Sequence, residues 1–298
     1  MILTFLCLNI VFIVNCFIID SHAHIGQVLN FNMKEEDILY SMNQYNISFS
    51  LVSNGESVEY DHNHILLPEE QRISQIKSNK RAVEFAKANP NKIGALIWIK
   101  PITERCNSEF ISFVKENRKY IYGFKIHTFH SKISANDIRL ENYYSLAEEL
   151  DLPVVIHSDI NNEGNPLHIY NAAKRHKKIN FVIVHMGLGS DHKESFKYIS
   201  KLNNLYGDTT WVSYTDVIEA VKFCGSEKIL FGTDNPIDGK DTLKAYLPIF
   251  SNLKIILKNE DYENVMYKNA KKRATANRAS IPILQRSLYK RNDLVHIV

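Results

Sequence analysis

Two histidines with one residue between them are the pair in this sequence best suited to chemistry. His22 and His24 follow an apolar run, 17–19, and the acid Asp20. On a β-strand, residues i and i+2 point to the same face, so both imidazoles should project together from the end of a buried strand. Neighbouring neutral imidazoles are good ligands for zinc or a similar divalent metal. Since the chain has 12 histidines, such a pair also arises by chance, and its interpretation depends on the residues further along the chain.

Further histidine, lysine and aspartate residues stand at the ends of later apolar runs. They are Lys125, His127, His157, His185 and Asp234. A single histidine at a strand end is more often a satisfied polar residue than a ligand. Five strands that all end in this way indicate a shared site, because parallel strands of a barrel place their C-terminal ends on one rim.

Eight short apolar runs alternate with segments of helical periodicity. The runs are 17–20, 47–52, 93–99, 121–126, 154–156, 181–184, 205–208 and 229–231. They are apolar on both faces, as expected for parallel strands covered by helices. Eight strand–helix units favour an α/β fold with a single closed (β/α)8 barrel of the TIM type, and an open doubly wound sheet is the alternative.

The composition is that of an ordinary globular protein, with 45% hydrophobic and 23% charged residues. A net charge of +3 gives no reason to expect nucleic acid or an anionic membrane as a partner. The 4 cysteines are scattered without a C-x-x-C pair. This spacing excludes a disulfide framework and a zinc–cysteine site, and it favours a reduced, cytoplasmic protein.

The two ends of the chain differ in composition from the segment 17–272, which we expect to form the barrel. Residues 1–16 are almost wholly apolar, but no Lys or Arg precedes the run and no clear cleavage site comes after it. We interpret them as an apolar extension, and a secretory signal, a membrane anchor or an upstream start remains open. The basic tail 273–298 is expected to be a solvated or loosely packed extension.

Taken together, the motifs resemble those of the amidohydrolase superfamily, in particular amidohydrolase family 2 (amidohydrolase-related). The matching segments are Asp-Ser-His-Ala-His at 20–24, Gly-Phe-Lys-Ile-His at 123–127, Val-Ile-His at 155–157, Val-His-Met-Gly at 184–187 and Phe-Gly-Thr-Asp-Asn-Pro at 231–236. Each motif alone is weak, but their order and spacing are specific. The resemblance covers roughly residues 17–272.

The resemblance implies a divalent metal, commonly zinc with manganese or iron as alternatives. Its implied ligands are His22, His24, His157 and Asp234. A metal-activated water would attack a C–N or C–O bond of a small amide, lactone or ester. Asp234 would accept a proton from that water and pass it to the leaving group, and His185 would polarise the substrate carbonyl or act as an acid or base.

Lys125 determines how many metals the resemblance implies. If carboxylated, it would bridge two metals, whereas a free ammonium would hold a carboxylate of the substrate. We favour one metal, because His127 beside it is better interpreted as a substrate contact than as a ligand.

Two other functions stay open: a metal-dependent decarboxylase or hydratase of a small carboxylic acid, and a catalytically inactive barrel that acts as a binding protein. TatD-type deoxyribonucleases share the His-x-His start but carry a mid-chain Glu at a strand end, which the runs ending near 99 and 126 lack. A second His-x-His, His62 and His64, falls in a polar loop, expected to be solvated or a lid over the substrate. Apart from a small-molecule substrate, the partner that we allow for is a second copy of the chain in a homo-oligomer.

Overall fold

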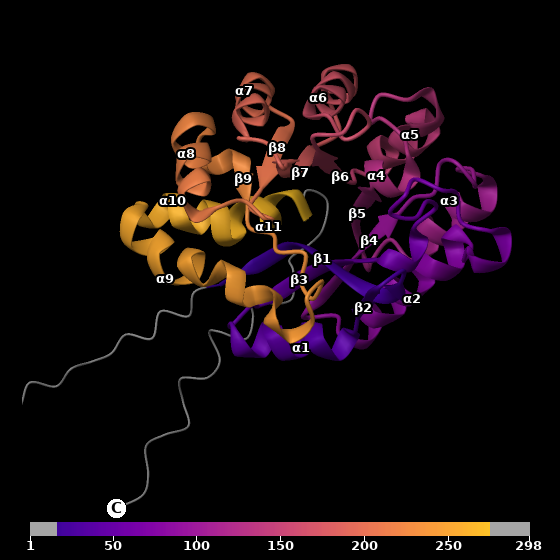
Figure 1. Ribbon diagram of the computed structural model, residues 1–298, viewed down its shortest axis with the longest axis horizontal. Coiled ribbons are helices and arrows are strands. Elements are labelled where there is room, and N and C mark those ends of the chain that lie inside the picture. The colour runs from indigo at the N-terminus through magenta and orange to yellow at the C-terminus, as the bar shows by residue number, and fades with distance from the viewer. Residues whose placement is uncertain (1–16, 275–298) are drawn as a thin grey trace, which may run out of the picture.

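The structure is a computed structural model that describes residues 17–274, with side chains described for 17–272. The predictions for residues 1–16 and for the rest of the basic tail lie outside the described residues. Parallel strands form one curled sheet surrounded by helices (Figure 1). In sheet order they are β1 (Ile19–Val28), β3 (Phe49–Asn54), β4 (Ile93–Trp98), β5 (Ile121–Ile126), β6 (Val154–Asp159), β7 (Phe181–Leu188), β8 (Leu205–Asp208) and β9 (Ile229–Leu230).

The sheet closes on itself between its first and last parallel strands. The N–H of Ser21 donates to the carbonyl of Phe231 at 2.9 Å, and the N–H of His24 donates to the carbonyl of Asn235 at 2.9 Å. Ala23 and Asn235 form a parallel bridge at the same place. The predicted (β/α)8 barrel of the TIM type is therefore confirmed.

One short strand, β2 (Phe31–Met33), pairs antiparallel with the end of β1 and extends beyond the barrel. The bend into this hairpin needs a glycine, because Gly26 has φ of +109° and a Cβ atom there would lie 2.2 Å from Oδ1 of Asn54. The hairpin thus leaves the barrel directly after the His-x-His segment.

The helices cover the outside of the barrel (Figure 1). They are α1 (Glu35–Gln44), α2 (Gln75–Ala88), α3 (Ser108–Glu116), α4 (Thr128–Ser131), α5 (Glu141–Glu149), α6 (Pro166–Arg175), α7 (Lys193–Lys201), α8 (Tyr214–Cys224), α9 (Leu247–Ile256), α10 (Asn259–Glu263) and α11 (Asn269–Ala274). None of the helices in the described part of the chain combines the length and the apolar content needed to span a bilayer.

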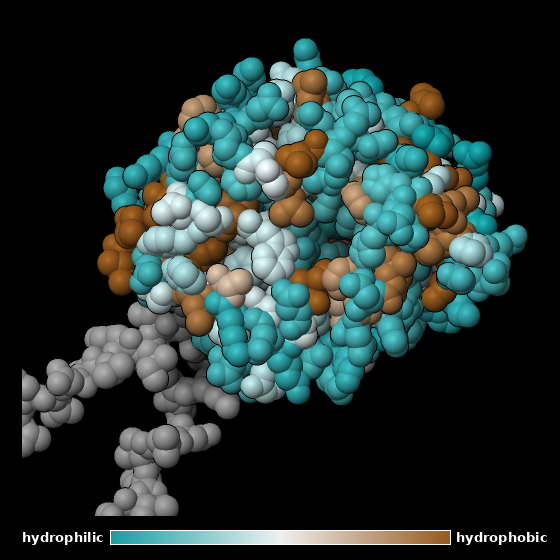
Figure 2. All heavy atoms as spheres, viewed as in Figure 1, coloured by the Kyte–Doolittle hydropathy of each residue, from teal (hydrophilic) through white to brown (hydrophobic). Residues whose placement is uncertain are grey.

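Apolar side chains inside the barrel form a floor beneath its C-terminal end. Along β6, Val154 and Ile156 belong to the core between sheet and helices, whereas Val155 belongs to a separate inner cluster. Because side chains alternate along a strand, His157 follows Val155 onto the inner face. The same alternation places Lys125 between the outward Phe124 and Ile126. The polar residues therefore lie above an apolar plug, and Figure 2 shows a hollow near the centre of this face.

A buried carboxyl group, that of Glu59, fixes the loop 58–66. Its Oε1 accepts hydrogen bonds from the N–H of Ile102 at 3.1 Å, and from the N–H and hydroxyl of Thr103 at 2.6 and 2.8 Å. Thr103 is of a residue type that often caps a helix, but it begins none here because its polar groups are bound to Glu59. Helix α3 begins later instead, where Asn107 accepts from the N–H of Phe110.

Replacing Glu59 with Gln should change how stability depends on pH. Burial raises the pKa of Glu59 although its hydrogen-bond donors lower it. The folded protein therefore holds this proton more tightly than the unfolded chain, and this contribution to stability is lost as the pH rises through the folded pKa. Gln keeps an acceptor and stays neutral at every pH. The melting temperature of Glu59→Gln minus that of the wild type should therefore be larger at about pH 9 than at about pH 5. The increase should be roughly 2–4 °C for each kcal/mol of stability that the wild type loses over this range. The exposed Glu69→Gln is the control, and equal differences at both pH values would contradict the account.

Candidate metal centre

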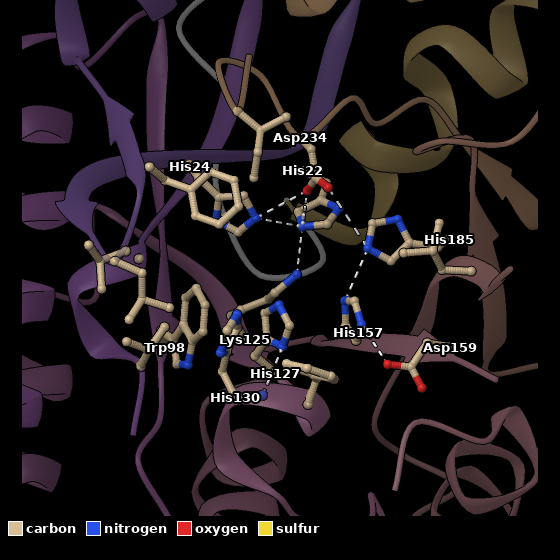
Figure 3. Close-up of a pocket in the computed structure, with 18 of the residues that line it drawn as sticks. His22, His24, Trp98, Lys125, His127, His130, His157, Asp159, His185 and Asp234 are labelled. Carbon is tan, nitrogen blue, oxygen red and sulfur yellow. Dashed lines mark hydrogen bonds and ion pairs between the residues drawn. The ribbon is translucent and has the colours of Figure 1, made fainter. Parts of the chain in front are cut away.

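Three donor side chains meet at the C-terminal end of the barrel (Figure 3). His22 and His24 come from β1, and Asp234 comes from the segment after β9. The two histidine Nε2 atoms lie 3.1 Å apart, and Oδ1 of Asp234 lies 3.0 Å from that of His22 and 3.1 Å from that of His24. All three side chains are buried, and within residues 17–272 they are the group whose ligand atoms all lie within 4.8 Å of one another.

The outer ring nitrogens of both histidines have partners of their own. Nδ1 of His22 lies 3.2 Å from Oδ2 of Asp208, and a carboxylate can only accept, so Nδ1 carries the proton. Nδ1 of His24 lies 2.9 Å from the hydroxyl of Ser53. Nε2 of His22 therefore carries a lone pair, which faces a carboxylate oxygen and a second imidazole. This donor set fits a divalent cation, and such outer partners orient metal-binding histidines.

The ionisation of these groups also suits a metal. Burial lowers the pKa of His22 well below its usual value, assisted by the nearby ammonium of Lys125. Burial likewise lowers the pKa of His24. Burial raises the pKa of Asp234, but the imidazoles of His22 and His185 outweigh this effect and hold it well below the usual range. Neutral imidazoles and an ionised carboxylate are the forms that bind metals.

Lys125 points at the same cluster from β5. Its Nζ lies 2.5 Å from Nε2 of His22, and the side chain is fully buried. Burial lowers the pKa of Lys125 to about 8, although the carboxylates of Asp234 and Asp208 oppose that shift. The lysine thus occupies a place from which it can contact a substrate or a metal.

His157 and His185 lie beside the cluster rather than in it. Nδ1 of His157 lies 3.1 Å from Nε2 of His185, whose distance to Oδ2 of Asp234 is 3.9 Å. Nε2 of His157 lies 3.1 Å from Oδ2 of Asp159, and Nδ1 of His185 lies 3.2 Å from the carbonyl of Thr210. Because both of these partners can only accept, the two nitrogens that face each other carry lone pairs. His157 as a metal ligand stays a prediction.

His127 forms part of a stack of aromatic rings. Its imidazole is stacked on Trp98 at a centroid distance of 5.0 Å and on His157 at 4.0 Å. His127 is also the N-cap of α4, where its Nδ1 accepts a hydrogen bond, at 3.4 Å, from the N–H of His130. Burial lowers the pKa of His127 well below its usual value, so this ring is neutral. It forms a flat wall beside the cluster, and its predicted role as a substrate contact stays a prediction.

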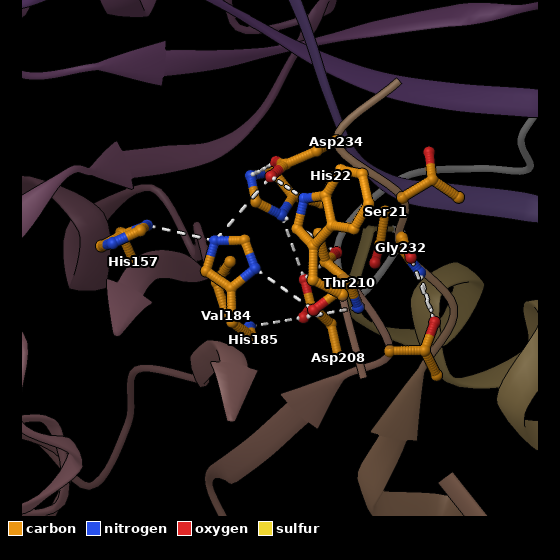
Figure 4. A network of polar contacts seen from close by, with 12 residues as sticks. Ser21, His22, His157, Val184, His185, Asp208, Thr210, Gly232 and Asp234 are labelled. Carbon is orange, nitrogen blue, oxygen red and sulfur yellow. Dashed lines mark hydrogen bonds and ion pairs between the residues drawn. The ribbon is translucent and has the colours of Figure 1, made fainter. Parts of the chain in front are cut away.

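Asp208, which was not predicted as a site residue from the sequence, connects several site residues (Figure 4). Besides His22, it accepts from the N–H of His185 at 2.8 Å and from the hydroxyl of Thr210 at 3.0 Å. His185 has φ of 64°, a left-handed conformation that is unfavourable for a residue other than glycine. The hydrogen bond that its N–H donates to Asp208 helps to hold His185 in this conformation. The sequence could have indicated Asp208 as a site residue, because it ends the seventh predicted strand, as the predicted site residues end theirs.

Asp208→Asn should weaken metal binding by about 10–100-fold, because the partner that orients His22 is altered. Metal affinity of the purified protein, measured against a competing chelator, checks this. Asp216→Asn makes the same chemical change at the start of α8, where the side chain is partly exposed, and should leave the affinity unchanged. An Asp208→Asn protein with wild-type affinity would show that the Asp208–His22 contact does not support the site.

A cavity of about 420 Å³ lies over the cluster. Aromatic side chains in its wall include Trp98 and Trp211, and Nε1 of Trp211 donates to Oδ2 of Asp234 at 2.8 Å. His62, from the second His-x-His, also lines the cavity, and its Nε2 lies 2.8 Å from Oδ1 of Asn30 in the β1–β2 turn. The loop 58–66 therefore lies at the mouth, where a lid would be.

Comparisons with known proteins agree with this geometry. The sequence profile described as amidohydrolase matches residues 19–272. A search of curated proteins finds no match.

Solved structures share the fold at low sequence identity. One is an uncharacterised TIM-barrel protein from Bordetella bronchiseptica, with 18% identity and a TM-score of 0.63, covering 86% of this chain and 99% of that chain. Another is a variant of 5-carboxyvanillate decarboxylase from Novosphingobium aromaticivorans with bound manganese and 3-methoxy-4-hydroxy-5-nitrobenzoic acid. It has 10% identity and a TM-score of 0.65, covering 87% of this chain and 97% of that chain. A third is dihydroxybenzoic acid decarboxylase from Polaromonas sp. JS666 with manganese and the inhibitor 2-nitroresorcinol. It has 14% identity and a TM-score of 0.64, covering 89% of this chain and 99% of that chain.

Proposed function

This chain belongs to the amidohydrolase family, and on that premise we propose that it is a divalent-metal-dependent hydrolase that cleaves a C–N or C–O bond of a small acyl substrate. An amide, a lactone or an ester would serve. The observation that carries the proposal is the buried cluster of His22, His24 and Asp234 at the inner end of the cavity. Zinc suits these donors, and manganese or iron suits them as well.

His22, His24 and Asp234 would hold the metal, with His157 as a further ligand. When bound, the metal lowers the pKa of water and polarises a carbonyl oxygen. Asp234 accepts the proton of the attacking water on its carboxylate and returns it to the leaving nitrogen or oxygen. Trp211 holds Oδ2 of that carboxylate through its N–H, which orients the group for both transfers.

His185 acts as a proton acceptor beside Asp234. Burial lowers its pKa to about 4, so the ring is neutral near pH 7. Its Nδ1 proton is directed at the carbonyl of Thr210, so Nε2 presents a lone pair to the cavity. Of the two roles expected from the sequence, this tautomer favours acid–base work over polarisation of the carbonyl.

Lys125 positions the substrate in the one-metal mechanism that we favour. With a pKa of about 8, its amine is mostly protonated near pH 7 before a metal is bound. An ammonium there would bind a carboxylate or acyl oxygen of the substrate next to the reacting carbon. In the two-metal alternative, the same side chain would be carboxylated and bridge the metals.

Decarboxylation of a carboxylic acid is the second candidate. Its support is the aromatic wall formed by Trp98 and the His127 ring, against which a planar substrate could stack. The bond between the carboxylate and the substrate carbon would break and carbon dioxide would leave. Asp234 or His185 would take up a proton from water and pass it to that carbon.

The two candidates are separated by products. The full chain loaded with zinc or manganese is incubated with carboxylated amides and lactones and with aromatic carboxylic acids, while hydrolysis and released carbon dioxide are recorded in parallel. The proposal expects hydrolysis that a chelator abolishes. Carbon dioxide without hydrolysis would replace it with the second candidate, and neither product from a metal-loaded protein would favour a binding protein.

A further inference from the structure

Large apolar side chains continue from the inside of the cavity onto the surface of the protein. Leu29, Ile160 and Leu188 all line the cavity, yet they are 39%, 69% and 37% exposed. Exposed apolar groups of this size that border a cavity mark a surface that an apolar ligand covers. We name these three residues the apolar rim.

Most polar groups of the cavity lie at its inner end, whereas His62 and Asn161 are exposed polar residues of the lining. His22 and Lys125 are fully buried, and Asp234 and His185 are nearly so. Lys125 is the one lysine among the described residues that line the cavity, and no arginine is among them. An anionic or acyl group is therefore recognised at the inner end, and a second anionic group at the mouth would find no fixed cation.

Apolar side chains connect the inner end to the rim. Met33 and Val58 are buried, and Phe31, Phe129 and Ile237 are partly buried in the cavity wall. The cavity thus becomes more apolar from the metal cluster outward, and Figure 2 shows hydrophobic side chains beside the hollow on this face. A ligand that matches this gradient has one polar head and an apolar body.

The rim is built from separate elements that border one opening. Ile160 follows β6, Leu188 ends β7, and the N–H of Ile160 donates to the carbonyl of Leu188 at 3.2 Å, so the two lie together as a shelf. Leu29 belongs to the β1–β2 turn. Because the shelf is continuous with the wall above the metal cluster, the occupant that fits it is the part of a substrate that extends out of the cavity.

We propose that the substrate is an amphiphile: an acyl compound whose polar head reaches the metal cluster and whose alkyl or other apolar chain leaves the cavity across Leu29, Ile160 and Leu188. This inference rests on the proposed function and deepens it, since it assigns the class of acyl group. The test therefore separates binding at the metal from binding at the rim.

Straight-chain alkyl hydroxamates from two to twelve carbons are suitable probes, because the hydroxamate binds the metal and the chain length varies alone. The 2 tryptophans of the sequence, Trp98 and Trp211, both line the cavity, so their fluorescence reports binding to the zinc-loaded full chain. Affinity should rise roughly threefold to fourfold per methylene, until the chain extends past the rim.

The variant Ile160→Asn should reduce the ratio of dodecyl to acetyl hydroxamate affinity by about tenfold, and Leu188→Asn should act in the same direction. Ile138→Asn is the matched control, because Ile138 is 79% exposed and lies outside the cavity lining. The control should keep the wild-type ratio.

Affinity that does not change with chain length, or rim variants with the wild-type ratio, would overturn the inference and leave the proposed function standing. Rim variants that instead convert an oligomer to a monomer in sedimentation, with the ratio unchanged, would assign the rim to a subunit interface and also overturn it. If no hydroxamate of any length binds the zinc-loaded protein, the proposed function fails and the inference with it.

Discussion

Asp234→Asn is expected to lower turnover by about 10²–10⁴-fold and to release most of the bound metal. The first effect follows from the loss of the carboxylate that transfers the proton. The second follows because Oδ1 of Asp234 lies 3.0 and 3.1 Å from the Nε2 atoms of His22 and His24, so the amide removes a charged donor from the cluster. Elemental analysis and turnover measured on one preparation check both effects.

Asp238→Asn is the matched control, because it lies in the same segment and is exposed. It should keep both metal and turnover, and circular dichroism should show that both variants are folded. An Asp234→Asn protein with full metal content and full turnover would show that the cluster is not the catalytic centre.

His185→Asn is expected to lower turnover by about 10²-fold or more while metal content stays near one per chain. The reason is that Nε2 of His185 lies beside Asp234, at 3.9 Å, but outside the three-donor cluster. In a one-metal site its loss removes a proton acceptor and not a ligand. Metal content by elemental analysis, together with turnover, gives the result.

In the two-metal alternative, His157 and His185 could bind the second metal. Nδ1 of His157 and Nε2 of His185 lie 3.1 Å apart and both carry lone pairs. If a second metal is bound there, the wild type should contain two metals per chain, and His185→Asn should contain about one. Lys125→Ala should then also fall to about one, because the bridging group is lost. That pattern would rule out the one-metal mechanism, whereas unchanged metal and unchanged turnover in His185→Asn would rule out a role for His185 in either.

The convergence of the site residues could be predicted because it depends on strand periodicity alone. His22 and His24 are two positions apart on one strand, and parallel strands of a barrel end on one rim. Asp234 joins them from the other end of the chain for the same reason. Neither conclusion requires the side-chain conformations.

The features that could not be predicted depend on side-chain conformation and on contacts between distant segments. His157 stays a predicted ligand, and the direction of its ring depends on Asp159, two residues later, and on His185 from the neighbouring strand. Trp98 and Trp211 gave no signal, because an aromatic residue near a strand end is usually part of a core. The hairpin formed by β1 and β2 was missed because the segment 25–33 has no strong alternation.

The place where the barrel closes has a consequence for how the protein is made. His24 and Asp234 are 210 positions apart and face each other across the seam between the first strand and the segment after the last. A chain that is still being synthesised has His22 and His24 long before it has Asp234. The complete donor set therefore exists only once the ring of strands has closed, so a metal that needs all three donors would bind only after the barrel is complete. If a metal binds there, it would stabilise the folded state, because it would join the first strand to the segment after the last strand.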